Sequence, residues 1–161
     1  MPDVYKFLED NKINYTEFKH PAVYTCEEAE RLCPEMPGAH TKNIFLRDKN
    51  GERHFLVVVG YEKNVDLKSL KELFGVSKLS FASPERLKKY LGVEPGSVTL
   101  LGLMNDTDHA VEVYFDEAIW EKPLLCHPLV NTATLAIPLE GIKTFLAATR
   151  HKYKVINVVG R

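Results

Sequence analysis

The feature that most constrains the fold is a pair of strand-like segments separated by an Asn-Gly dipeptide. Residues 41–47 and 53–60 are rich in β-branched, aromatic and other apolar side chains, and Asn50 and Gly51 lie between them. Asn-Gly favours the positive φ angles that a tight β-hairpin turn requires. Immediately upstream, two prolines and a glycine within residues 34–38 predict a loop. The sequence therefore predicts a loop that leads directly into a hairpin.

Helices are predicted where a capping side chain precedes regularly spaced apolar residues. The expected caps are Asp3, Thr25, Asp66 and Ser83. The helix that begins with the capping box at residues 25–28 is expected to end near Pro34, and glycines are expected to end the two that follow. A last helix is predicted around residues 142–146. Further strands are predicted at residues 15–18, 78–82, 110–115, 135–137 and 155–159.

Strands and helices interleave along the whole chain, and no repeat or linker separates them. We therefore expect one domain over residues 1–161 with a mixed α/β fold. The connections are too irregular for a doubly wound sheet. A strongly bent mixed sheet, or a partial barrel flanked by helices, fits the pattern better. Alternating polarity at residues 110–115 predicts a half-buried strand in it.

Composition limits the classes of function. The longest clear apolar run, residues 55–59, is far shorter than the ~20 residues that cross a bilayer, and the N-terminal residues do not resemble a secretory signal. These features predict a cytoplasmic protein. The formal net charge of −1 argues against a protein that coats nucleic acid, although a local contact stays open. Lys88, Lys89 and residues 150–154 are the densest basic groups, and they can equally be solvated surface.

Cysteine and histidine spacing gives no sign of a metal or disulfide framework. The three cysteines, Cys26, Cys33 and Cys126, form no C-x-x-C pair and leave an odd thiol. This is typical of reduced, structural cysteines in a cytosolic protein. The six histidines are scattered without chelating spacing, so neither a metal nor another cofactor is expected.

Common enzyme signatures are also missing, including G-x-S-x-G and the phosphate-binding loops. An enzyme with this sequence must therefore work without a strong nucleophile. Three segments remain that packing explains poorly: residues 41–43, 96–106 and 127–134. Each also has a plain structural interpretation, as an exposed lysine at Lys42, turn-forming glycines, and a loop around His127 held by side-chain hydrogen bonds. The residues alone leave the function undecided.

At these three segments the sequence resembles the free-standing editing domains related to prolyl-tRNA synthetase, the YbaK and ProXp-ala family. The matching text is "TKNIFLRDKNGERHFLVVV" from residue 41, "LGVEPGSVTLLGLMND" from residue 91 and "HPLVNTAT" from residue 127. The resemblance covers nearly the whole chain, and the three motifs follow the family's order. One departure is the pair Leu100-Leu101, where the family carries a Pro-Phe or similar pair. This change affects the pocket wall and thus the amino acid that is recognised.

The resemblance implies roles for particular residues. Lys42 would grip the terminal nucleotide and place the ester, with Asn43 offering hydrogen bonds beside it. Gly102 would allow close approach of the backbone to the substrate. His127 would orient the ribose or the attacking water. The substrate-binding residues implied are Leu32, Thr41, Phe81, Leu103, Asn105, Asn131 and Thr132.

The resemblance also implies a reaction. Family members hydrolyse the ester of mischarged tRNA(Pro), here most of all alanyl-tRNA(Pro), with help from the substrate's own ribose hydroxyl and without a metal. The expected partners are the 3′ end and acceptor stem of the tRNA and a prolyl-tRNA synthetase, and neither DNA nor a membrane. Two alternatives stay open: a deacylase for serine or cysteine, and a non-catalytic module that binds aminoacyl-tRNA. A complete synthetase does not fit within 161 residues.

Overall fold

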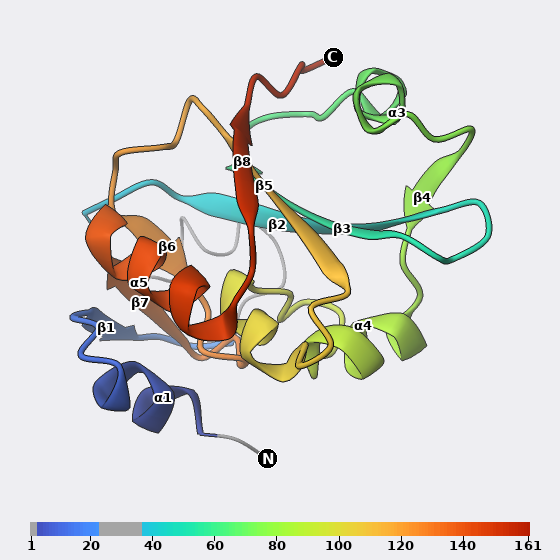
Figure 1. The fold of residues 1–161 in the computed structure, drawn as a ribbon. Helices are drawn as coiled ribbons and strands as arrows, with labels where there is room; N and C mark the ends of the chain where they lie inside the picture. The colour runs from blue at the N-terminus through green and yellow to red at the C-terminus, as the bar shows by residue number, and fades with distance from the viewer. Residues whose placement is uncertain (1–2, 23–36) are drawn as a thin grey trace.

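The computed structural model describes residues 3–22 and 37–161 (Figure 1). Its helices are α1 (Val4–Asp10), α3 (Leu67–Phe74), α4 (Pro84–Leu91), the 3-10 helix η1 (Leu100–Asn105) and α5 (Leu139–Thr149). Its strands are β1 (Thr16–Lys19), β2 (Thr41–Asp48), β3 (His54–Gly60), β4 (Leu79–Phe81), β5 (Val111–Asp116), β6 (Leu124–Cys126), β7 (Ala133–Ile137) and β8 (Tyr153–Ile156). The mixed α/β class predicted from the sequence is confirmed. The helix and loop predicted across residues 25–36 lie outside the described residues.

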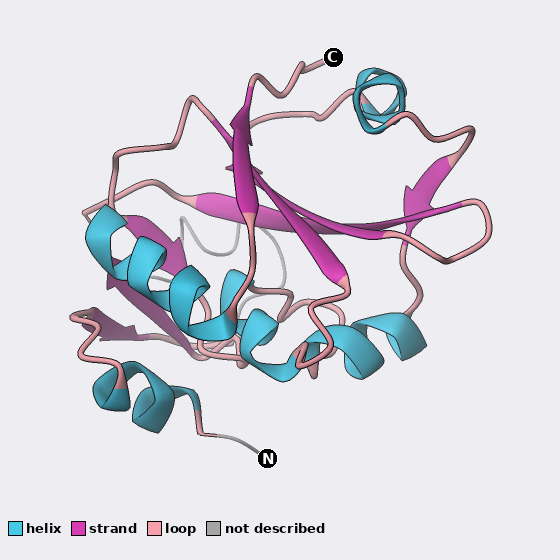
Figure 2. Cartoon of the chain, in the orientation of Figure 1, coloured by secondary structure: helices cyan, strands magenta, loops and turns pink. Residues whose placement is uncertain are grey.

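The described strands form two sheets. One has three antiparallel strands in the order β1-β7-β6, and the other has five strands in the order β4-β2-β3-β5-β8. In the larger sheet β2 and β3 are antiparallel, whereas β3, β5 and β8 run parallel. Figure 2 shows the smaller sheet beside α1 and α5. The sequence analysis expected a bent sheet or partial barrel flanked by helices. The structure has this mixed arrangement in the form of two sheets that share one core.

The predicted hairpin is β2 and β3, but its turn differs from the expectation. Gly51 has a positive φ of 70°, whereas Asn50 does not. The Asp48 carboxylate accepts hydrogen bonds from the backbone amides of Glu52 and Arg53, at 2.9 and 3.2 Å. Because this side chain satisfies the loop amides, a longer loop is stable and a two-residue turn is unnecessary.

Strand β3 lies at the centre of the larger sheet, and it is buried on both faces. On one face Phe55 stacks on Phe74 of α3, with 4.3 Å between ring centroids. On the other face Leu56 and Val58 belong to the main core, which α4, η1 and α5 cover. Figure 1 shows α3 on one side of this sheet and α4 and α5 on the other. Burial on both faces explains why residues 55–59 are continuously apolar.

Strand β5 is more buried than its alternating sequence predicts. Alternation over residues 110–115 would place Tyr114 on the same solvent face as Glu112, yet Tyr114 is only 9% exposed. Its ring packs against Phe55 and Phe74, because α3 covers this face as well. The closing strand also differs from the prediction. It ends at Ile156, since Val158 and Val159 leave the sheet to contact Asp116 and Asp66 through their backbones.

The two sheets meet where β2 begins. Ala39 forms a parallel bridge with Leu124, and the backbone of Ala39 accepts a hydrogen bond from Leu125 at 3.2 Å. The three-residue strand β6 was not predicted. It ends at Cys126 and thereby places His127 at the junction of the sheets. Within the described residues no helix has both the length and the apolar character needed to span a bilayer.

Candidate functional site

Two hydrogen bonds bring the three sequence motifs together. The Thr41 hydroxyl donates to the carbonyl oxygen of Leu125 at 3.0 Å, which ties the start of the hairpin to β6. The Thr99 hydroxyl donates to the carbonyl oxygen of His127 at 2.6 Å, which ties the cap of η1 to the end of the same strand. Segments 28 and 84 residues apart in sequence therefore converge on one short stretch of backbone. We call this junction the candidate site.

The side chains of Lys42 and Asn43 start on opposite faces of β2, because successive side chains in a strand alternate. Asn43 shares its face with Thr41 and with the core residue Phe45. Lys42 shares its face with Ile44, which belongs to the smaller apolar core between the sheet and α3. The structure thus brings Asn43, rather than Lys42, to the side of the sheet on which Thr41 bonds to β6. The two side chains therefore start from different faces of β2, and their shared role in one site stays a prediction.

Both residues nevertheless have unused bonding capacity. The Asn43 Oδ1 atom is buried and has no hydrogen-bond partner among the residues that the structure describes. Lys42 is half-buried and forms no hydrogen bond or ion pair with any residue that the structure describes. Leaving a buried acceptor unpaired costs about 1–3 kcal/mol, so such atoms are rare unless a ligand or water serves them. Asn43 is therefore a candidate ligand contact on structural grounds.

His127 is half-buried and has a defined tautomer. Its Nδ1 lies 3.3 Å from the carbonyl oxygen of Ala133, and because a carbonyl can only accept, Nδ1 carries the proton. The Nε2 atom then presents a lone pair, which no described residue occupies. Burial lowers the pKa of His127, nearby His20 lowers it further, and the Ala133 carbonyl opposes the shift. His127 is consequently neutral near pH 7 and able to accept a proton or a hydrogen bond.

His20 was missed from the sequence. It is buried, its Nε2 lies 2.8 Å from the Thr134 hydroxyl, and its Nδ1 lies 2.9 Å from the carbonyl oxygen of Pro21. Its backbone amide donates to the carbonyl of Thr132 at 3.0 Å. The sequence did contain an indication of this role, because His20 and His127 each follow directly after a strand and precede a proline. His20 holds the segment that follows His127 against β1.

Gly102, Leu103 and Asn105 are explained by packing of η1 against α4. A Cβ on Gly102 would lie 2.8 Å from the carbonyl oxygen of Leu91 and 2.9 Å from its Cβ. Leu103 is buried in the core, and the Asn105 side-chain amide donates to the same Leu91 carbonyl at 3.0 Å. The glycine thus lets two helices approach, rather than leaving room for a substrate at its Cβ position. The roles of these three residues in substrate binding remain predictions.

Phe81 does not join the candidate site. It pairs with Leu46 on β2, whereas the site lies at Thr41, five residues along the strand. At a rise of about 3.3 Å per residue these positions are roughly 16 Å apart. Phe81 is 65% exposed on β4, an edge strand. Of the remaining predicted contacts, Thr132 is exposed, Asn131 is half-buried, and Leu32 lies outside the described residues.

Cys126 precedes His127 but does not form a Cys-His nucleophile. Its side chain is 3% exposed, and burial raises the pKa of the thiol to about 12. A thiol with this pKa has essentially no thiolate at pH 7. Cys126 is therefore structural, as predicted, while Cys26 and Cys33 fall outside the described residues. In the parts of the chain that the structure describes, no three His, Cys, Asp or Glu side chains gather as metal ligands, and metal-independence stays a prediction.

Comparison with known proteins decides the family. The sequence profile of the aminoacyl-tRNA editing domain matches residues 20–145. The chain belongs to the aminoacyl-tRNA editing domain family. It is 40% identical over 152 residues to a protein from Acetoanaerobium sticklandii named prolyl-tRNA editing protein ProX, covering 94% of this chain and 93% of that protein. It is 34% identical over 149 residues to prolyl-tRNA synthetase associated domain-containing protein 1 of Danio rerio, covering 91% and 80%.

Solved structures support the fold. Hypothetical protein APE2540 superposes with a TM-score of 0.72 at 17% identity, covering 96% of this chain and 98% of that one. A structure described as a candidate trans-editing enzyme for prolyl tRNA synthetase gives a TM-score of 0.68 at 18% identity, covering 100% and 99%. At these identities the likeness shows a shared fold. The editing-domain architecture expected from the sequence is thereby confirmed.

Proposed function

We propose that this editing domain is a free-standing deacylase that hydrolyses mischarged tRNA(Pro) in the cytoplasm, with alanyl-tRNA(Pro) as its principal substrate. Three findings support the proposal. The family is one of aminoacyl-tRNA editing, a relative named for prolyl-tRNA editing is 40% identical over almost its whole length, and the three motifs converge at one junction. The observation that carries the site is the buried, unpaired Oδ1 of Asn43.

The substrate offers the bonds that the site leaves open. An aminoacyl-adenosine presents hydrogen-bond donors in its α-ammonium group and its free ribose hydroxyl, and Asn43 Oδ1 is a buried acceptor. A bond between them would satisfy the acceptor and hold the ester in place. Binding energy used for alignment lowers the barrier of a reaction whose ester is already activated. No covalent intermediate is required, which agrees with the inert thiol of Cys126.

His127 and Lys42 have complementary roles in this proposal. The neutral imidazole of His127 offers Nε2 to the ribose hydroxyl or to the attacking water. Lys42 is the second residue of β2, so its long side chain can extend past the end of the strand toward the terminal phosphate or adenosine. The charge on its ammonium group would hold the nucleotide while the ribose hydroxyl assists the water.

Selectivity for alanine follows from size. A synthetase site built for proline rejects a smaller amino acid by only about 1–3 kcal/mol per missing methylene. A second, narrower site that excludes the proline ring removes the error and leaves the correct product intact. The same argument admits serine and cysteine, which are also small. A non-catalytic module that binds aminoacyl-tRNA is the alternative from a different class.

One assay separates these outcomes. Purified protein is incubated with alanyl-, seryl-, cysteinyl- and prolyl-tRNA(Pro), and the remaining ester is measured over time. We expect rapid loss of the alanyl ester and none of the prolyl ester, unchanged by a metal chelator. Preferred loss of the seryl or cysteinyl ester would reassign the amino acid. Tight binding without hydrolysis of any ester would support the non-catalytic module.

A second assay assigns His127. In the His127→Ala variant we expect a slower single-turnover rate at saturating enzyme, because a group that positions the water acts on the chemical step. Weaker binding with a normal single-turnover rate would exclude His127 from that step.

A further inference from the structure

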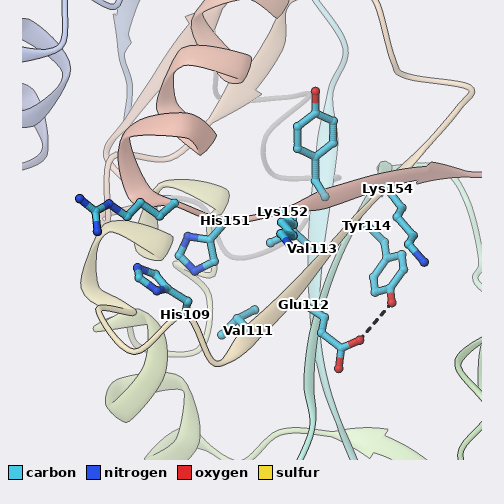
Figure 3. Close-up of a pocket in the computed structure, with 10 residues that line it drawn as sticks. His109, Val111, Glu112, Val113, Tyr114, His151, Lys152 and Lys154 are labelled. Carbon is cyan, nitrogen blue, oxygen red and sulfur yellow. Dashed lines mark hydrogen bonds between the residues drawn. The ribbon is translucent and has the colours of Figure 1, made fainter.

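A separate cavity of about 780 Å³ lies beside the edge strand β8, away from the junction of the three motifs (Figure 3). Its lining includes the basic segment at residues 150–154, which the sequence analysis left without a function. Figure 3 shows His109 and His151 next to each other at one end of the cavity and Lys154 beside Tyr114 at the other, with Lys152 between them. The two imidazole rings are edge to face, with 5.6 Å between centroids. We call this cavity the basic groove.

The cations of the groove are not neutralised by the protein. Arg150, Lys152 and Lys154 are exposed, and none forms an ion pair with another described residue. The one carboxylate in the lining, Glu112, is occupied by the guanidinium of Arg53 through two bonds of 2.8 Å. Its charge is therefore already balanced. Three uncompensated positive charges on five consecutive residues make an anion-binding surface in a chain whose net charge is −1.

Arg150 stands at a left-handed helix end, where glycine is the residue with the least strain. Helices α3 and α4 end in left-handed residues that are glycines, Gly75 and Gly92. Helix α5 ends in the same conformation at Arg150, with a φ of 61°. A residue with a Cβ is strained there, whereas glycine is not. His109, in the same lining, has a φ of 54°. The groove thus holds two side chains at positions where backbone geometry favours glycine.

The groove and the candidate site are connected through η1. His151 bonds to Asp106, the residue that ends η1, with 2.8 Å between Nε2 and Oδ2. Thr99, at the other end of η1, bonds to His127. Six residues of 3-10 helix at about 2.0 Å each separate the two ends by on the order of 12 Å. The end of the groove at His151 is therefore linked to the candidate site through one short helix.

We propose that the basic groove binds the phosphodiester backbone of the tRNA acceptor stem while the 3′ end occupies the candidate site. The inference rests on the proposed function for the identity of the RNA. Phosphate contacts position an RNA without reading its sequence, and exposed lysine and arginine are the side chains that make them. The groove would therefore set the register of the stem, and the amino acid would be selected elsewhere.

The test measures binding of uncharged tRNA(Pro) by fluorescence anisotropy at several salt concentrations. The double variant Lys152→Ala, Lys154→Ala should bind more weakly at every salt concentration. Each phosphate contact contributes about 0.7–0.9 to the slope of log affinity against log salt, so the slope should fall by about 1.4–1.8. Lys68→Ala with Lys78→Ala is the matched control, because it removes two exposed lysines outside the groove. An unchanged slope in the groove variant, or an equal loss in the control, overturns the proposal.

Arg150→Gly separates binding from folding. Because glycine relieves the left-handed strain, the melting temperature should stay the same or rise, while the salt slope falls by about 0.7–0.9. Unchanged tRNA binding by this variant counts against the groove.

Failure of the proposed function would look different. In that case the wild-type protein hydrolyses no aminoacyl-tRNA, yet the groove variants still lose salt-dependent RNA binding. If instead the wild type deacylates alanyl-tRNA(Pro) and the groove variants keep both normal affinity and normal KM, the groove proposal alone is wrong.

Discussion

Two polar clusters lie at opposite ends of η1, and they differ in how completely their hydrogen bonds are made. At one end Asp106 accepts from the backbone amides of Ala110 and Val111, at 3.1 and 2.8 Å, and from His151 at 2.8 Å. His151 uses its other ring nitrogen on the Thr149 hydroxyl at 2.9 Å. At the other end, Asn43 Oδ1 has no partner, and His127 has an unoccupied Nε2 among the described residues.

This difference distinguishes polar groups that stabilise the fold from polar groups that are available to a ligand. Buried polar groups are normally paired, because an unpaired group costs more than a hydrogen bond gains. A fully paired cluster such as that of Asp106 stabilises the fold and has no capacity left for a ligand. A cluster with free acceptors is less stable on its own and gains bonds when a substrate arrives. The sequence motif that ends in Asn105-Asp106 therefore has a structural end, and the proposed site lies at the other end, near Thr99.

The largest expected effect comes from Lys42→Ala. Removing a charged group that holds the nucleotide and aligns the ester should lower kcat/KM for deacylation by about 10²-fold, because a misplaced reacting group loses the benefit of alignment. Stability should change by less than about 0.5 kcal/mol, because Lys42 has no described partner. The rate is measured on alanyl-tRNA(Pro), with Lys68→Ala as the control. Near-normal activity would show that the face of β2 opposite Asn43 is not part of the site.

The next largest effect is a loss of stability when the hydrogen-bonded cluster around Asp106 is broken. Asp106→Ala leaves His151 and two backbone amides without their acceptor, so the free energy of unfolding should fall by about 3 kcal/mol or more. Chemical denaturation measures the change, and the exposed neighbour Asp108 supplies the control variant Asp108→Ala. A loss below about 1 kcal/mol would mean that the cluster contributes little to the fold. The comparison between the two ends of η1 would then lose its basis.

A smaller change in the free energy of unfolding, opposite in sign to that of Asp106→Ala, is expected for a substitution at Asn43. Asn43→Leu replaces an amide whose buried Oδ1 is unpaired among the described residues with an apolar side chain of similar size, so stability should rise by about 1 kcal/mol. Deacylation should fall at least about ten-fold, since the substrate loses an acceptor. Thermal unfolding and the deacylation assay are run on the same preparation. A variant that is less stable than the wild type would show that Asn43 is a structural residue.

The smallest expected effect is the pH dependence from His127. Its pKa is lowered by burial, so the imidazole stays neutral, and the reaction at saturating substrate should keep its rate as pH falls to about 6.5 and decline only below that. In unfolded chains His127 takes up its proton near pH 6.5, before the folded state does. Stability should therefore decrease as pH falls through this region. A rate that already declines above pH 7 in the wild type, and not in His127→Gln, would contradict the lowered pKa.

Local signals in the sequence were sufficient for most of the fold. Asp66 and Gly75 bound α3 as predicted, and Ser83 and Gly92 bound α4, because caps and left-handed ends depend on few neighbouring residues. The short strand β6 was missed because its three residues gain their partners only from β7 and the segment at Ala39. Burial of Tyr114 also depends on α3, which is distant in sequence.

The candidate site was less predictable than the fold. The three motifs were recognised from the sequence, yet the role of each residue depends on the direction of its side chain. Phe81 resembled a pocket wall in sequence, but the register of β4 on β2 places it at the far end of the strand. Gly102 resembled a substrate contact, although its missing Cβ is required by Leu91. Such roles come from tertiary contacts that no local pattern encodes.

The buried strand β3 has a consequence for synthesis on the ribosome. Its antiparallel partner β2 precedes it, but its parallel partner β5 begins 57 residues later, since His54 pairs with Val111. At a synthesis rate of about 5–20 residues per second, the free edge of β3 stays unpaired for roughly 3–11 seconds before that partner is made. During this interval the nascent hairpin exposes a row of unpaired amides and carbonyls. This member of an aminoacyl-tRNA editing family is thus exposed to misassembly while it is being made.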